Sequence, residues 1–200
     1  MLIVATGNED KMREMRRILS KYSLISMREA GIEAEIEENG QSFAENALIK
    51  AREICRLSGK ETIADDSGLV VEALGGAPGI YSARYGGENT SYPEKMHKLL
   101  TEIAATGDQE RKASYVCVIA YVTPGGEEYT FEGVCNGRIG FAPCGTNGFG
   151  YDPLFISEDT GRTFAEMEAQ EKDKYSHRTR ALEKLHAFLK KKGSSHSATF

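Results

Sequence analysis

The sequence predicts an α/β fold with a mixed sheet, and three patterns indicate it. An apolar strand, Leu2 to Thr6, is followed at once by apolar residues at helical spacing. Strand and helix patterns continue to alternate as far as about residue 104, which is typical of parallel strands joined by helices. A nearly all-apolar run over 113–123 then turns at Pro124-Gly125-Gly126 and returns with alternating aromatic residues. This hairpin adds antiparallel strands to the sheet.

Each expected element follows from a local pattern of this kind. In order, they are a strand over 2–6, a helix from Asn8, a strand over 22–27, a helix from Ser42 to Gly59, strands over 62–64 and 69–74, a helix over 91–104, hairpin strands over 113–123 and 129–133, and a helix over 176–192. Ser42 and Glu45 have the spacing of a capping box. We expect one domain over 1–192 and a flexible tail over 193–200, which has no periodicity.

Composition limits the possible functions. The net charge of -5 over 200 residues argues against a surface for nucleic acid polymers, although a small anionic ligand is compatible with it. The four cysteines form no C-x-x-C pair, which indicates reduced thiols and a cytoplasmic protein. The first apolar run is too short for a signal peptide, and no segment reaches the length of a membrane span. We therefore expect a soluble protein with no membrane partner.

The stretch Thr6 to Lys11, "TGNEDK", lies where the first strand meets the first helix. A helix N-terminus has free N–H groups and a positive dipole end, and a preceding glycine lets a phosphate come close. Lys11 would add a positive charge. Alternatively, Asn8 is only a helix cap and Lys11 a solvated surface residue.

Carboxylates gather in two places. In "ADDSG", Asp65 and Asp66 cannot both face one ligand unless the strand bends, because successive side chains point to opposite faces. One of them would brace the turn, and the other would bind a metal or accept a proton from water, with Ser67 near a phosphate. An ordinary Asx turn is the alternative. Glu37-Glu38, just upstream of the helix that begins at Ser42, could supply a second carboxylate to Mg²⁺; alternatively, acidic residues before a helix N-terminus are simply stabilising.

Two later stretches indicate a binding site. "GTNGFGYDPLF" interleaves glycines with Phe149, Tyr151 and Phe155, and such rings can form a platform on which a base stacks; tight packing explains the same pattern. In "KDKYSHRTRA", His177 and Arg178 fall in the first turn of a helix, where cations oppose the macrodipole. Either an acceptor-rich ligand or a structural salt bridge accounts for them. No G-x-S-x-G elbow occurs, so water is the expected nucleophile.

Six motifs in order, "TGNEDK", "FAENALIKA", "ADDSGL", "GGAPGIYSARY", "GFGYDPLF" and "SHRTRAL", resemble the inosine-triphosphate pyrophosphatase family over nearly all of Leu2 to Leu189. The resemblance implies a homodimer of two-lobed subunits around a long twisted mixed sheet flanked by helices. It implies Mg²⁺-dependent hydrolysis of ITP, dITP and XTP to the monophosphate and pyrophosphate. A nucleotide-binding regulator without turnover, or a pyrophosphatase for other modified nucleotides, remains an alternative.

The family pattern also implies a role for each matching residue. Asp66 would be the general base and a metal ligand, with Glu37 the second ligand. The residues implied to bind substrate are Thr6, Gly7, Asn8, Glu9, Asp10, Lys11, Ser67, Phe149, Gly150, Tyr151, Asp152, Lys172, His177 and Arg178. The glycine-rich segment "GGAPGIYSARYGG" is expected to lack helix and strand, so that Ile80, Tyr81 and Tyr85 would anchor a dimer interface.

Overall fold

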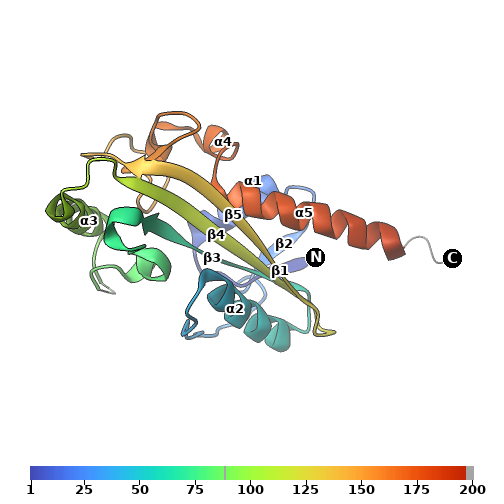
Figure 1. Cartoon of the computed structure of the whole chain (residues 1–200). Coiled ribbons are helices and arrows are strands. Elements are labelled where there is room, and N and C mark those ends of the chain that lie inside the picture. Colours follow the sequence, from blue (N-terminus) through green and yellow to red (C-terminus); the bar gives the residue numbers. More distant parts are fainter. Residues whose placement is uncertain (88, 197–200) are drawn as a thin grey trace. The chain divides into compact units, whose positions relative to one another are not determined.

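The computed structural model describes residues 1–87 and 89–196, and it has the α/β fold that the sequence predicts (Figure 1). Six strands form one sheet in the order β2-β1-β3-β4-β5-β6. The chain divides into two compact units. Unit 1 consists of residues 1–66, 117–133 and the described part of 178–200, and unit 2 consists of the described part of 67–116 with residues 134–177.

The sheet is mixed, as expected. Its strands are β1 (Leu2–Val4), β2 (Leu24–Ser26), β3 (Thr62–Val71), β4 (Lys112–Val122), β5 (Glu128–Ile139) and β6 (Phe155–Ser157). β1 pairs in parallel with both β2 and β3, whereas β5 pairs antiparallel with β6. No helix among the described residues is long and apolar enough to cross a membrane.

Helices cover both faces of the sheet in unit 1. α1 (Glu9–Ile18) and α5 (His177–His196) pack on one face, and α2 (Phe43–Ser58) packs on the other (Figure 1). On β3, Ile63 packs with α1 and α5, while the next residue, Ala64, packs with α2. This two-residue alternation fixes the directions of the side chains that follow along the same strand.

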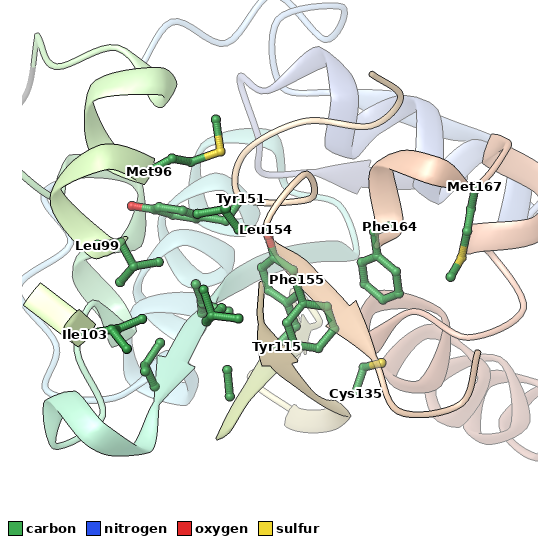
Figure 2. Packing of buried hydrophobic residues seen from close by; sticks show 14 residues of the cluster. Met96, Leu99, Ile103, Tyr115, Cys135, Tyr151, Leu154, Phe155, Phe164 and Met167 are labelled. Atoms are coloured by element: carbon green, nitrogen blue, oxygen red, sulfur yellow. The ribbon is translucent and has the colours of Figure 1, made fainter. Parts of the chain in front are cut away.

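Unit 2 has an aromatic core. It contains the helices α3 (Tyr92–Thr106) and α4 (Ala169–Lys172) and the 3₁₀ helices η1 (Glu72–Leu74), η2 (Gly79–Arg84) and η3 (Phe164–Glu166). Side chains of α3 pack with rings from β4, β6 and η3 (Figure 2). The ring centroid of Tyr115 lies 4.7 Å from that of Phe155 and 5.8 Å from that of Phe164.

Four local expectations need correction. The two strands expected around "DDSG" are one continuous strand, β3, so the aspartates lie within a strand and not in a turn. The glycine-rich segment contains η2. Ser42 caps α2 by accepting a bond from the Glu45 N–H, but the Glu45 carboxylate bonds the N–H of Gln41 and not that of the cap residue. α5 continues to His196, past the expected end at 192, and residues 197–200 lie outside the described residues.

A glycine permits the pairing of β5 with β6. Gly137 lies opposite Ser157, and a Cβ at this position would clash with the carbonyl oxygen of Ile156 and crowd the Phe155 ring. We expect Gly137→Ala to lower the free energy of unfolding by roughly 2 kcal/mol or more, because overpacking must displace a backbone. Urea unfolding checks this. Gly125→Ala is the control, since its nearest neighbour would be in ordinary van der Waals contact; equal stability of both variants would contradict the prediction.

Candidate functional site

Asp65 and Asp66 are adjacent in β3 and point to opposite faces of the sheet. Both are buried, with exposed fractions of 1% and 7%. Because β3 is extended through both residues, Asp65 follows Ile63 toward α1 and α5, and Asp66 follows Ala64 toward α2. The two carboxylates therefore lie in different electrostatic environments.

Asp65 belongs to a buried network of two cations and two carboxylates in unit 1. Its Oδ1 forms an ion pair with Lys11 Nζ, and its Oδ2 accepts a 3.0 Å bond from Arg178 Nε and a 2.9 Å bond from the Cys117 thiol. Arg178 Nη1 also donates to Glu14. Arg178 and Lys11 hold the pKa of Asp65 well below its usual range although burial opposes this. This aspartate is thus a fixed, neutralised anion.

Asp66 faces a different group of charges. Its Oδ1 lies 3.5 Å from Lys50 Nζ, and the same amine lies 3.0 Å from Glu38 Oε2. Its Oδ2 is buried and has no hydrogen-bond partner among the described residues. Burial raises the pKa of Asp66 from 3.8 to about 6. The positive charges of Lys50 and Lys11 oppose this rise, and the negative charges of Glu38 and Asp65 add smaller contributions to it. A carboxylate with such a pKa and an open acceptor can take a proton near neutral pH.

Of the pair Glu37-Glu38, the carboxylate beside Asp66 is that of Glu38 and not that of Glu37, which the family resemblance implied as the second metal ligand. Glu37 is exposed, and within the described residues no ion pair or hydrogen bond joins it to Asp66. Asn46 of α2 holds the segment that carries Glu38, because its Oδ1 accepts a 2.9 Å bond from the Gly40 N–H. Exposed and half-buried residues alternate along this irregular segment, so the distance of a residue from a motif cannot decide between the neighbours Glu37 and Glu38.

Lys50 is a site residue that the sequence analysis missed. It lies on α2, one turn after Asn46, and both residues are directly next to the apolar stripe formed by Ala47 and Ala51. Its side chain is 12% exposed, low for a lysine. A lysine bordering a buried stripe is the signal that could have identified it.

The stretch Thr6 to Lys11 combines the two interpretations left open above. Asn8 is the N-cap of α1, and its Oδ1 accepts bonds from the N–H groups of Asp10 and Lys11. Lys11, however, is not solvated, because it pairs with Asp65. A groove of about 530 Å³ begins at Gly7 and runs along residues 27–35, all in unit 1. This groove is the space beside the helix N-terminus that a ligand could occupy.

In unit 2, a buried ion pair fixes the conformation of the segment "GTNGFGYDPLF". Lys172 Nζ lies 2.6 Å from Asp152 Oδ2, which also accepts a 3.0 Å bond from the Phe149 N–H. The Lys172 amine lies 4.8 Å from the centroid of the Phe149 ring. Gly148 has φ +72°, and a Cβ there would overlap the Asp152 carboxylate, so this turn requires glycine.

Of the three rings expected to form a platform, two belong to the core. Tyr151 is buried and its hydroxyl donates to the Ser82 carbonyl at 3.0 Å, and Phe155 is fully buried. Phe149 is half-buried, as is Gly150 beside it. The packing explanation therefore holds for the side chains of Tyr151 and Phe155.

The remaining expected residues have distinct surroundings. Ser67 is half-buried on β3, and His177 is buried with its ring stacked on Tyr115 at 4.6 Å between centroids. Arg178 is 1% exposed and bonded to two buried carboxylates, which supports the salt-bridge alternative. The carboxylates of Glu9 and Asp10 suit the first turn of α1 through its dipole, and would repel a phosphate.

The chain is similar to known proteins over almost its whole length. A model of the Ham1 family matches residues 2–188. The dITP/XTP pyrophosphatase of Bacillus licheniformis is 48% identical over 190 residues, which cover 94% of this chain and 97% of that protein. The dITP/XTP pyrophosphatase of Haemophilus influenzae is 47% identical over 192 residues, with 94% and 98% covered. The solved structure of a HAM1 protein from Coxiella burnetii has a TM-score of 0.88 at 40% identity and covers 95% of this chain and 98% of that one.

The two aspartates should respond differently to the same substitution. Asp65→Asn leaves Lys11 and Arg178 with reduced neutralisation in a buried site, so the free energy of unfolding should fall by about 3 kcal/mol. Asp66→Asn removes a carboxylate whose charged form is disfavoured by burial, so the fold should be retained. Urea unfolding at pH 7.5 without metal measures both. Greater loss in Asp66→Asn than in Asp65→Asn would show that we have exchanged their roles.

The raised pKa of Asp66 predicts a pH dependence. Between 3.8 and about 6 the folded state binds a proton that the unfolded state releases, so the free energy of unfolding falls as the pH rises through this window. The effect is at most about 3 kcal/mol. Asp66→Asn should lack this pH dependence. Measured in the presence of a chelator, the free energy of unfolding of Asp66→Asn minus that of the wild type should increase from pH 4 to 6 and stay constant above pH 6. A constant difference across this range would contradict the raised pKa.

Proposed function

Because the chain belongs to the Ham1 family, and its relatives include proteins named dITP/XTP pyrophosphatase, we propose that it hydrolyses non-canonical purine nucleoside triphosphates to the monophosphate and pyrophosphate. Its substrates are then dITP, ITP and XTP. The structural observation that best supports this is Asp66, a buried carboxylate with an unbonded oxygen beside Lys50 and Glu38. Such a group is suited to deprotonating a water that attacks a phosphorus atom.

Asp66 is the proposed general base. The ideal base has a pKa near the operating pH, and burial brings the pKa of this carboxyl to about 6. The adjacent Asp65 cannot take this role, because Lys11 and Arg178 keep it ionised and bonded. Strand alternation thus separates a structural aspartate from a reactive one.

Mg²⁺ fits this site by the chemistry of its donors. It is usually held by one or two carboxylates together with substrate phosphates, and Asp66 and Glu38 are two carboxylates that share one amine, that of Lys50. No cluster of three or more metal-binding side chains occurs among the described residues, so substrate oxygens would complete the set. When bound, Mg²⁺ would neutralise phosphate charge and polarise the bond that breaks. Lys50 would then be available to a phosphate oxygen.

The phosphates are proposed to lie at the N-terminus of α1. Thr6, Gly7 and Asn8 precede the helix, and Lys11 is its cation closest to β3. The N-terminal dipole and backbone N–H groups favour an anion here. We propose that the residues from Thr6 to Lys11 act through backbone and Lys11, because Glu9 and Asp10 carry the wrong charge for a phosphate.

The base is proposed to be bound by unit 2. Phe149 offers a half-buried ring, and Lys172 and Asp152 fix the segment that carries it. His177 supplies N–H donors that match the 6-oxo group of hypoxanthine or xanthine, whereas adenine presents a 6-amino donor. A buried donor that faces a donor stays unpaired, so this edge would reject adenine.

Turnover should depend on Asp66 and on Glu38. Asp66→Asn and Glu38→Gln should each lower kcat for dITP by about 10²-fold or more, since they remove the base or a metal carboxylate. Release of pyrophosphate at saturating Mg²⁺ is the measurement. Glu37→Gln is the matched control and should retain near wild-type kcat. If only Glu37→Gln loses activity, Glu37 and not Glu38 is the second metal ligand. If the wild-type protein binds dITP but does not hydrolyse it, the protein is a nucleotide-binding regulator.

We also propose that the protein is a cytoplasmic homodimer. The proposal of a dimer rests on the exposed side chains of residues 75–87, "GGAPGIYSARYGG". Tyr81 of η2 is 55% exposed, whereas Tyr85 is half-buried against the core of unit 2. Tyr81 is therefore the best anchor that this segment offers. Sedimentation at micromolar concentration should give twice the 22.0 kDa of one chain, and Tyr81→Glu should shift it toward the monomer. A monomeric wild type would refute this proposal.

A further inference from the structure

Tyr115 connects the parts of the proposed base site in unit 2. It lies in β4 with an exposed fraction of 7%, and its ring is nearly parallel to that of His177, at 9° and 4.6 Å between centroids. The centroid of the Tyr115 ring also lies 4.7 Å from that of Phe155 and 5.8 Å from that of Phe164 (Figure 2). The Tyr115 ring therefore lies flat against the His177 imidazole, whereas the Phe164 ring lies farther from the imidazole, at 6.4 Å and 12°.

The phenol of Tyr115 is influenced by the charge of Asp152. Burial and the charge of Asp152 raise the pKa of this phenol well above its usual value, and a hydrogen bond with the Tyr151 backbone opposes the rise. The phenol is thus neutral at physiological pH and lies beside the turn that presents Phe149.

We propose that Tyr115 is a positioning residue for base selectivity, because its ring lies flat against the His177 imidazole and orients it. This inference rests on the proposed function for the identity of the base. Imidazole N–H groups donate only in the plane of their ring, so the ring plane decides which edge atom of a purine they reach. A tilt that lets the imidazole turn away would weaken binding of a 6-oxo purine and leave adenine little affected.

The test compares two changes at this position. Tyr115→Leu removes the stacking surface but keeps an apolar side chain, and it should lower the ratio of kcat/KM for ITP to that for ATP by about tenfold or more. Tyr115→Phe keeps the ring and should retain most of the selectivity. Phe155→Leu is the matched control, because it removes a buried ring that packs on Tyr115 and lowers stability without removing the surface under His177.

A second measurement separates this inference from the proposed function. The imidazole signals of His177 by NMR, and binding of IMP and AMP by calorimetry, need no turnover. In Tyr115→Leu, the ring-current shift of His177 should be lost and the preference for IMP over AMP should narrow. Wild-type protein that fails to hydrolyse ITP would overturn the proposed function alone. Unchanged selectivity in Tyr115→Leu, or equal narrowing in Phe155→Leu, would overturn the role of Tyr115.

Discussion

The extended conformation of β3 at Asp65 and Asp66 is the constraint on which the rest of the candidate site depends. In a strand, adjacent side chains point to opposite faces, so one carboxylate enters the network of Lys11, Arg178 and Glu14 and the other faces Lys50. Two identical side chains thereby acquire pKa values shifted in opposite directions. Opposed shifts of this kind are how neighbouring carboxyl groups obtain separate roles.

The two buried carboxylates, Asp65 and Asp66, differ in how far neighbouring cations compensate their charge. Burying an ionised group costs several kcal/mol unless it is paired. Asp65 meets this cost with two cations, and its network joins α1, β3, β4 and α5 through named side chains. Asp66 is less well compensated, because its Oδ2 has no hydrogen-bond partner in the part of the chain that the structure describes. The fully paired charge network thus lies on one face of β3, and the proposed general base, Asp66, lies on the other.

Unit 2 follows the same division between packing and binding. Tyr151 and Phe155 are buried in its core, and Tyr115 contacts Phe155 and stacks on His177, while Phe149 stays half-buried. The buried pair of Lys172 and Asp152 fixes the turn that carries Phe149. Rings in the core orient the groups that we propose to contact the base, so a change in packing can alter selectivity.

The sequence by itself determined the α/β class, the mixed sheet and the helix caps at Asn8 and Gly59. These depend on periodicity and local hydrogen bonds, which a short stretch of chain contains. Tertiary structure decided what local patterns leave open: which aspartate is neutralised, that Glu38 and not Glu37 lies beside Lys50, and that Tyr115 stacks on His177. The partners in these contacts come from elements up to 113 residues apart, as for Arg178 and Asp65, and no local spacing encodes such a distance.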